Sequence, residues 1–333
     1  MTETMFRMFS HKDEGAHEPS DDPLWQESLV MVWLDAETGI GGSHRIGHEV
    51  NQCLANAWCG VMTDEGLRFR GNPTDLPLTP EDRAVDHYSA GAYAFDFGET
   101  GGIYTVDMPD CQLELAFEDF YAPCDAWDRK HESTVGSNIG VSNHFEVAGR
   151  VSGTARLGDR TYDIEGLCQR DHSWGPRDWS KSAGTRWCSG SFGRELSFTG
   201  TIAQGMDYNV LMGGVVVRGD EVIPADHVDS CVLLEPDGMS VRGASVTWEL
   251  RDGSTLEISC EPLDGVVFNI HDRIGQVDSI CRVTDADGNV GFCDLLVWNG
   301  LRRTAPILAS FGANFEEGLS RRPDVNRKPW PSH

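Results

Sequence analysis

Short apolar runs separated by turn residues fill the chain from residue 25 onward. Residues 28–34 are mostly apolar, residues 35–42 contain an aspartate and three glycines, and residues 43–50, which are more polar, are expected to be the returning strand. Runs of this size that are rich in β-branched and aromatic residues, and that are bounded by Gly, Pro, Asn or Asp, are typical of strands joined by hairpins. The beginning of the chain therefore predicts an antiparallel meander.

The same pattern recurs along the whole chain. It predicts further strands at residues 53–63, 66–70, 91–97, 103–107, 112–120, 145–157, 161–168, 186–192, 195–203, 208–218, 230–235, 245–250, 254–260, 279–284 and 290–298. The one helical signal is residues 79–88, where Thr79 can cap a first turn that contains Pro80 and two acidic residues. Fifteen or more strands would curl or split a single open sheet, so we expect an all-β fold of two successive barrels or sandwiches.

This pattern also suggests domain boundaries. Residues 1–23 are polar and unpatterned, and we expect a tail, or an arm that orders only by packing on something else. We assign a first β domain to residues 24–143, a second to residues 144–320, and a C-terminal tail to residues 321–333. Residues 121–143 are irregular, and we interpret them as the crossing between the two sheets.

Charge narrows the range of partners. The 333 residues carry a formal net charge of −26, which disfavours nucleic acids and anionic membrane surfaces because both would be repelled. The first thirty residues contain no sustained apolar run, so we expect neither a signal peptide nor a transmembrane helix, no stable membrane insertion, and a cytoplasmic location.

The ten cysteines are scattered and never occur as Cys-x-x-Cys, so we expect small buried hydrophobic residues rather than disulfides or a structural zinc site of the usual kind. The chain also lacks a Gly-x-Ser-x-Gly motif, a phosphate-binding loop and a dinucleotide fingerprint, which disfavours hydrolases, kinases and dehydrogenases. We expect no metal and no cofactor.

Residues 169–179 are the densest group of reactive side chains, and they follow the strand predicted at residues 161–168. They comprise two carboxylates, two guanidiniums, an imidazole and two indoles: Asp171, Asp178, Arg170, Arg177, His172, Trp174 and Trp179. A carboxyl group can protonate an alkene or expel water as a general acid, and aromatic faces and a carboxylate can stabilise the resulting cation. The alternative is a structural corner of ion pairs with the indoles beneath it.

We predict catalytic roles for Asp171, His172 and Asp178, and substrate-binding roles for the arginines and tryptophans of this stretch. A carboxyl group that donates a proton must be neutral, so its pKa must be raised by burial against the lowering effect of the arginines. Strict strand alternation would place His172 and Trp174 on one face and Asp171 on the other, unless a bulge before Gly175 breaks the alternation.

A second polar cluster contains His44, His48 and Glu49. On a strand the two histidines share a face but lie about 13 Å apart, which is too far for one metal ion unless the chain bends. We therefore consider two roles for these three residues, the lining of a pocket at the domain interface and a solvated strand.

Two consecutive meanders, with Asp171-His172-Ser173-Trp174-Gly175 where the second begins, resemble the two-domain lipocalin-like proteins that include carotenoid 1,2-hydratases, AttH-like proteins and fungal pericyclase relatives. The hydratases carry Asp-His-Asn-Trp-Gly in the matching place, so Ser173 replaces their asparagine. The resemblance implies two lipocalin-like domains. It also implies that a Tyr and an Asp downstream of the motif line the pocket, and Asp207 and Tyr208 match that spacing loosely, with a hairpin turn as the alternative.

These observations together favour a cofactor-independent lyase, a hydratase or dehydratase, or an isomerase. Its expected partner is a hydrophobic small molecule, an isoprenoid-like alkene or alcohol of the terpenoid or steroid type. The alternatives are a non-catalytic carrier of such a ligand and a pericyclase-like cyclase in which the shape of the pocket carries the rate. The sequence leaves a homodimer open.

Overall fold

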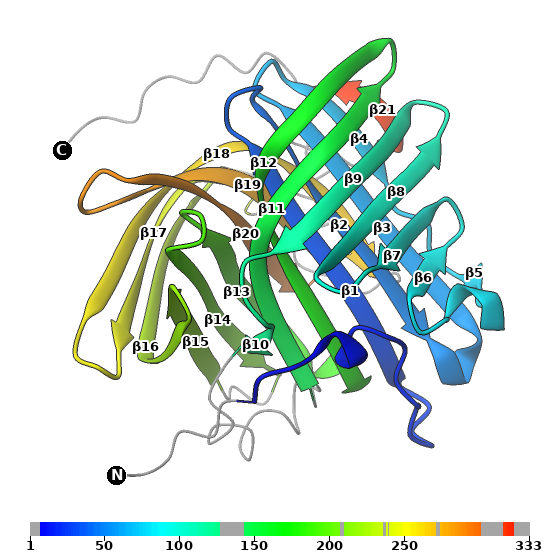
Figure 1. The fold of residues 1–333 in the computed structure, drawn as a ribbon, viewed down its shortest axis with the longest axis horizontal. Helices are drawn as coiled ribbons and strands as arrows, with labels where there is room; N and C mark the ends of the chain where they lie inside the picture. Colours follow the sequence, from blue (N-terminus) through cyan, green and yellow to red (C-terminus); the bar gives the residue numbers. More distant parts are fainter. Residues whose placement is uncertain are drawn as a thin grey trace.

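The computed structural model describes residues 7–126, 143–206, 210–235, 238, 240–270, 274–300 and 316–322. These residues form two β units, a curled thirteen-stranded sheet and a closed eight-stranded barrel (Figure 1). The prediction of an all-β fold with two lipocalin-like units is confirmed.

The first unit, called the sheet below, runs in the order β21-β4-β3-β2-β1-β12-β11-β9-β8-β7-β6, with β5 and β10 attached at the side. Its edge strand β6 folds back over β1 and β2, because Tyr88 stacks on His48 and donates a hydrogen bond to the carbonyl of Glu27. The sheet thus wraps around its own hydrophobic core. Its strands are β1 (Trp25–Asp35), β2 (Ile40–Glu49), β3 (Leu54–Thr63), β4 (Leu67–Gly71), β5 (Leu76–Pro77), β6 (His87–Ala90), β7 (Tyr93–Phe97), β8 (Gly101–Met108), β9 (Cys111–Asp119), β10 (Cys124–Asp125), β11 (Asn143–Leu157), β12 (Arg160–Pro176) and β21 (Gly318–Arg321).

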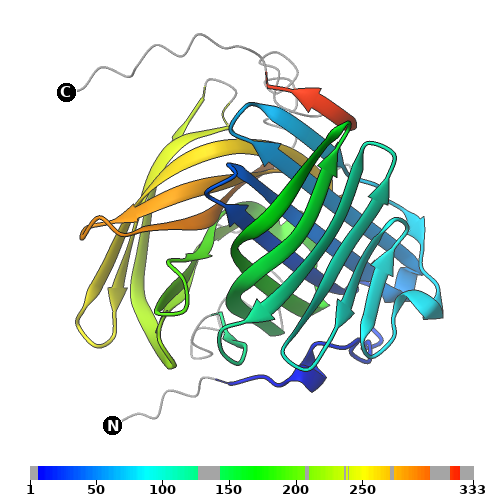
Figure 2. The same ribbon diagram turned by 45° about the horizontal axis from the view of Figure 1, so that its top comes forward.

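The second unit, called the barrel, is an up-and-down meander in which each strand pairs with the next and β20 returns to β13. Figure 2 shows it beside the sheet, with the C-terminal strand β21 returning to the sheet edge. Tight turns at residues 251–253 and 285–289, where the sequence has Asp, Gly and Asn, join consecutive barrel strands as hairpins. The barrel strands are β13 (Ser182–Ser191), β14 (Leu196–Gly205), β15 (Val210–Arg218), β16 (Glu221–Leu234), β17 (Val241–Leu250), β18 (Thr255–Ile270), β19 (Ile274–Asp285) and β20 (Val290–Gly300).

The predicted helix at residues 79–88 is wrong. Thr79 and Asp82 do form a reciprocal capping box, but it stabilises only the 3-10 turn η3 (Pro80–Asp82). The chain then enters β6, where Tyr88 is buried against the sheet, so tertiary pairing outweighs the local helix signal. No helix in the described ranges is long and apolar enough to cross a membrane.

The change from sheet to barrel does not fall at residue 144. Strands β11 and β12 pair with β9 and β1, so residues 143–176 belong to the sheet, and the barrel begins at Ser182. The local sequence pattern could not reveal this boundary, because β12 pairs with β1. That strand lies about 140 residues earlier in the chain, as the pair Met31↔Arg170 shows. The N-terminal arm is described from residue 7 onward, and Phe9 and Glu14 in it are buried.

Strand β1 is buried on both faces, which explains its unbroken apolar run. Leu29, Met31 and Trp33 point into the core of the sheet. Val32 and Leu34 point the other way and pack against the outer wall of the barrel. The sheet and the barrel therefore meet face to face along β1.

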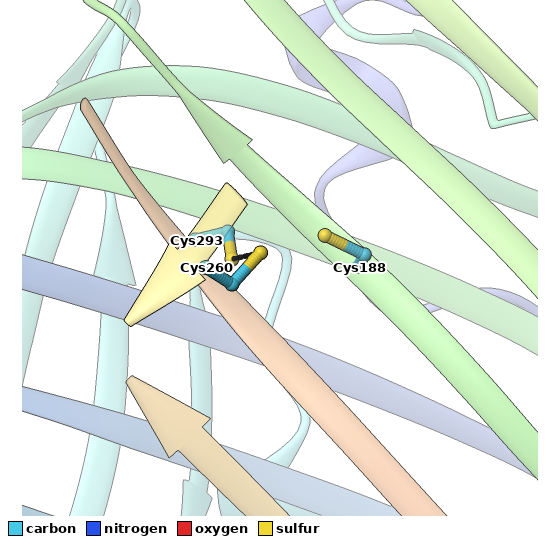
Figure 3. Close-up of side chains that lie close together, drawn as sticks. All are labelled: Cys188, Cys260 and Cys293. Carbon is cyan, nitrogen blue, oxygen red and sulfur yellow. Dashed lines mark hydrogen bonds between the residues drawn. The ribbon is translucent and has the colours of Figure 1, made fainter. Parts of the chain in front are cut away.

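Four cysteines lie on adjacent barrel strands and point into the barrel core: Cys260, Cys281, Cys293 and Cys188. The sulfurs of Cys188, Cys260 and Cys293 converge, with 3.8 Å between those of Cys260 and Cys293 (Figure 3). All ten cysteines are free thiols and only Cys53 and Cys231 are exposed, so the expectation of mostly buried, unpaired thiols is confirmed.

We expect two of the ten thiols to react with a thiol reagent such as Ellman's reagent in the native protein, and all ten after denaturation. The reason is that thiolates must be accessible to react, and eight of the thiols are buried. The reagent absorbance gives both counts directly. Native reaction of four or more thiols would contradict this burial, and the variant Cys53→Ser should lower the native count to one.

Candidate active site

A cavity of about 160 Å³, partly open to solvent, lies where the sheet and the barrel diverge. An enclosed cavity of this volume holds one benzene-sized ring in other proteins, and the open side of this one leaves room for a longer ligand. Its walls carry four indoles, and its polar groups come from both units. The lining residues are Ser28, Val30, Arg45, Trp58, His144, Asp171, Ser173, Arg177, Trp179, Thr185, Trp187, Thr201, Ala203, Leu211, Gln276, Asp278, Leu296 and Trp298.

Strand β12 delivers its polar residues to this cavity by simple alternation. Its register with β1 is unbroken from Leu167 to Pro176, so no bulge precedes Gly175. Asp171 and Ser173 therefore face the cavity, whereas His172 and Trp174 face away. The predicted alternation is confirmed, and it separates the residues that the sequence suggested would act together.

The imidazole partner of Asp171 is His144, at the start of the neighbouring strand β11. His144 Nε2 lies 2.6 Å from Asp171 Oδ2, and both side chains are largely buried. Burial lowers the pKa of His144, but the carboxylate of Asp171 outweighs that effect and raises the pKa above its ordinary value. Oδ1 of Asp171 is buried and has no hydrogen-bond partner among the described residues, so one oxygen of this carboxylate is available to a ligand.

Glu146 lies behind this pair and is fixed by the barrel. Its carboxylate accepts hydrogen bonds from Trp187 Nε1 at 2.9 Å, from Thr199 Oγ1 at 2.8 Å and from Ser189 Oγ. Burial raises its pKa. Because these donors come from the barrel and Glu146 from the sheet, this residue locks the two units together beside the cavity.

Asp278 reaches the cavity from the opposite wall, on β19. It is 1% exposed, and it accepts hydrogen bonds from Ser43 Oγ at 2.6 Å and from Gln276 Nε2 at 2.8 Å. Burial raises the pKa of Asp278 to about 7, despite these hydrogen bonds and the charge of Arg45. A substantial fraction of this carboxyl is therefore protonated at neutral pH.

Two guanidiniums complete the polar lining. Arg45 lies over the ring of Trp58 and donates to Asn56, and Arg177 lies over Trp179 and donates to Ser173 Oγ at 2.9 Å. Burial lowers the pKa of each to about 10, so both stay charged at neutral pH.

Arg170, a predicted substrate-binding residue, does not reach the cavity. Its side chain is 2% exposed and forms ion pairs with Glu14 of the arm and Asp119 of β9, at 2.8 and 2.6 Å. It also lies over the ring of Phe117. For Arg170, the alternative interpretation, a structural corner of ion pairs, is thus correct. The alternation of β12 places its side chain on the face that packs against the core of the sheet.

His172 and Trp174 do not reach the cavity either, because alternation places them on the same face of β12 as Arg170. His172 is fully buried and contacts Glu27 Oε1 at 3.0 Å, and Trp174 stacks on His17 of the arm at 3.7 Å. Glu27 also accepts from His17 and Arg83, and although burial alone would raise its pKa, the two histidines hold it far below its usual value. These residues anchor the arm to the sheet.

Asp178 is likewise outside the cavity. It caps the 3-10 turn η5 (Trp179–Lys181) by accepting from the backbone and side chain of Ser180. Trp179, one residue later, does line the cavity and packs edge-on against Trp298 at 5.5 Å. Of the central stretch, Asp171, Arg177 and Trp179 therefore reach the cavity, together with Ser173.

The cluster of His44, His48 and Glu49 also stays outside the cavity, and only its neighbour Arg45 enters it. His44 accepts from Trp33 Nε1 at 2.7 Å, and His48 Nε2 lies 2.7 Å from the carbonyl of Ser89. Burial lowers the pKa of His44 to about 3 and that of His48 to about 4, so both are neutral core residues.

Glu49, on the other face of β2, accepts from Asn56 Nδ2 at 3.0 Å, and the same amide side chain accepts from Arg45. The interpretation of a solvated strand is wrong for the whole cluster, because all three residues are buried. Asp207 and Tyr208 lie outside the described residues.

Two residues that line the cavity, His144 and Asp278, carried no signal in the sequence. Each lies near the end of a predicted strand without a motif around it, and their approach depends on the packing of the barrel on the sheet. Arg45 had a weak signal, as a member of the cluster around His44.

Among the residues that the structure describes, three groups of side chains have the donor atoms and spacing to hold a metal ion. They are Cys188 with Cys260 and Cys293, His17 with Glu27 and His172, and His144 with Glu146 and Asp171. In each group the donor atoms lie within 4.8 Å of one another. The first group suits a soft ion, and the carboxylate of the second is already occupied by hydrogen bonds. The cysteine spacing that argued against a metal site could not anticipate a set drawn from three separate strands.

Comparison with solved structures supports the fold. A protein assigned as AttH from Nitrosomonas europaea superposes with a TM-score of 0.63 at 14% identity, covering 86% of this chain and 94% of that one. CghA with Sch210972 gives 0.60 at 12% identity, covering 86% and 94%. Kievitone hydratase from Nectria haematococca gives 0.58 at 8% identity, covering 83% and 88%. At these identities the likeness shows the fold alone, and it confirms the expected resemblance at that level.

A comparison of the sequence with curated proteins finds no match. The family model described as "Domain of unknown function (DUF7064)" matches residues 10–300, which is most of the chain. The protein therefore belongs to the DUF7064 family.

Proposed function

We propose that the protein is a lyase of the hydratase or dehydratase type, or an isomerase, and that it acts by acid–base chemistry in the cavity between sheet and barrel. The observation that carries the proposal is the pair of carboxyl groups that line the cavity, Asp171 from the sheet and Asp278 from the barrel. Asp278 has a raised pKa and can donate a proton, and Asp171 keeps one unoccupied oxygen that can accept one.

The proposed dehydration uses both groups. The Asp171 carboxylate removes a proton from substrate carbon, and the electron pair of that C–H bond ends in the new double bond once the C–O bond has broken. The leaving hydroxyl takes the proton of Asp278 and departs as water. Solvent then carries the proton from Asp171 back to Asp278, so the net change is the loss of one water, and hydration is the reverse. His144 acts as a positioning residue that fixes the orientation of Asp171.

The fold of the structural neighbours supports this class of reaction, since one of them is named as a hydratase. The four indoles in the wall suit an apolar substrate body, and an isoprenoid-like skeleton of the terpenoid or steroid type stays our proposal for it. A carrier of the same ligand is the second candidate, because an apolar cavity would serve it equally well.

We expect protein purified from its own host to retain a bound small molecule, which native mass spectrometry and solvent extraction would identify. When this molecule is incubated with the protein in ¹⁸O-labelled water, we expect wild type to produce a partner that differs by one water, or to introduce the label. His144→Ala should slow this reaction by about one order of magnitude, because a carboxylate that has lost its orienting partner is less often well placed. Stoichiometric binding with no label, no mass change and no isomer of the bound molecule formed would instead establish the carrier.

A further inference from the structure

The cavity wall contains an excess of hydrogen-bond donors that no described residue satisfies. Five buried nitrogens that carry hydrogen lie in its lining residues without a partner: Arg45 Nη2, Arg177 Nε, Trp58 Nε1, Trp179 Nε1 and Trp298 Nε1. Buried donors are normally paired, because an unmet donor costs roughly 1–3 kcal/mol. Five in one cavity indicate a missing acceptor.

The two arginines are also short of negative charge. Elsewhere in the protein buried guanidiniums have carboxylates within hydrogen-bond distance, as Arg68 does with Asp264 and Arg170 with Glu14 and Asp119. Both are almost fully buried, yet no ion pair within 4.0 Å joins either of them to a carboxylate among the described residues. The carboxylates of Glu49, Asp171 and Asp278 act on Arg45, and that of Asp171 on Arg177, only from a greater distance. A buried charge without a partner is costly, and it is retained where a ligand supplies the counter-charge.

The chain makes room for this arrangement. Arg45 and Gly47 lie on the same face of β2, and a Cβ at Gly47 would come within 2.5 Å of the Arg45 guanidinium. The glycine therefore lets the guanidinium lie flat beside the strand. The ring of Trp58 lies against the Arg45 guanidinium and that of Trp179 against the Arg177 guanidinium. The distances from guanidinium carbon to ring centroid are 4.9 and 5.0 Å.

We infer that this cavity binds an oxygen-rich anionic head group, a carboxylate or an enolate, between Arg45 and Arg177, while the tryptophan rings hold the apolar body of the same molecule. The binding of a carboxylate does not depend on the proposed function, whereas the binding of an enolate rests on it. Guanidiniums disfavour a carbocation nearby, so the cation expected from the sequence is a poor intermediate here.

An oxyanion fits the site far better. In a β-hydroxy carbonyl substrate, loss of the α-proton to Asp171 would send the carbonyl π electrons onto its oxygen, and the arginine N–H groups would stabilise that charge. When the carbonyl re-forms, the β-hydroxyl leaves with the proton of Asp278 as water. The product is an α,β-unsaturated carbonyl compound, and an oxygen-free hydrocarbon is not a substrate of this kind.

The test compares two probes that share a ring system, 2-naphthoate and the neutral 2-naphthylmethanol, by titration calorimetry on the full-length protein. We expect 2-naphthoate to bind at least tenfold more tightly. Arg177→Gln should weaken its binding about tenfold or more and leave the alcohol nearly unchanged, because charged hydrogen bonds are lost only for the anion. Arg150→Gln, which removes an exposed arginine of β11 that pairs with Glu118, is the matched control and should change neither affinity.

A second variant keeps the inference testable if Arg177→Gln does not fold. Gly47→Ala keeps every donor and displaces only the flexible end of Arg45, so it should also weaken 2-naphthoate selectively. Equal or tighter binding of the alcohol, or no binding of 2-naphthoate, would overturn the inference. Turnover plays no part in these titrations, so selective binding of the anion without any reaction would leave the inference standing while the proposed lyase fails.

Discussion

Asp278→Asn is expected to reduce turnover about 10²- to 10⁴-fold, with little change in ligand affinity. An amide retains the shape of the carboxyl but cannot donate its proton to a leaving hydroxyl, and general acids contribute rate factors of this size. Turnover of the molecule extracted from the native protein gives the measurement. Asp178→Asn is the matched control, since Asp178 lies outside the cavity and caps a 3-10 turn, and it should leave turnover within about twofold of wild type.

Equal losses in the two aspartate variants would show that the cavity does not hold the acid. The pH profile gives a second criterion. Because the acid must be protonated, the rate of wild type should fall as the pH rises through about 7, and this limb should be absent from the residual activity of Asp278→Asn.

The same carboxyl affects stability with a definite sign. Its pKa is about 7 in the folded protein and near 3.8 in the unfolded chain, so between these values only the folded state holds the proton. Raising the pH through this window therefore lowers the free energy of unfolding, by up to about 1.4 kcal/mol per pH unit, and the slope vanishes on either side. Burial and the charge of Asp278 also raise the pKa of Asp294, so the difference between wild type and Asp278→Asn reports the two carboxyl groups together.

Arg170→Met is expected to lower the free energy of unfolding by about 3–5 kcal/mol, the largest effect on stability that we predict. The substitution keeps the apolar stem but leaves the carboxylates of Glu14 and Asp119 buried without their counter-charge. Equilibrium urea unfolding measures the change.

The control for Arg170→Met is Arg150→Met, which removes an exposed pair with Glu118 on the neighbouring strand and should cost less than about 1 kcal/mol. A loss below about 1 kcal/mol for Arg170→Met would mean that Arg170 is not the structural anchor of the arm. Its role in substrate binding, which the sequence suggested, would then need to be considered again.

Much of the fold could be predicted from the sequence because strands and turns are local signals. The hairpin turns at residues 251–253 and 285–289 and the alternation along β12 needed no knowledge of distant partners. What could not be predicted was pairing across the chain. The assignment of β11 and β12 to the sheet depends on contacts with β1 and β9 that no local pattern encodes.

The site illustrates the same limit. Alternation correctly separated Asp171 from His172, yet it could not say which face of β12 would meet the barrel. Asp171 then acquired His144 as a partner from the adjacent strand, and Asp278 came from the other unit, about a hundred residues later. The proposed mechanism needs a neutral carboxyl, and burial raises the pKa of a carboxyl at Asp278, a position without any motif.

The most direct test of an acid–base site in this cavity is the protonation state of Asp278. The infrared difference spectrum between wild type and Asp278→Asn, recorded across a pH series, reports the carbonyl stretch of a protonated carboxyl group at this one position. We predict that the band is present at pH 5 and disappears as the pH rises through about 7. If the spectrum shows only the deprotonated carboxylate at every pH from 5 upward, Asp278 is not the acid. That result would contradict the proposed mechanism.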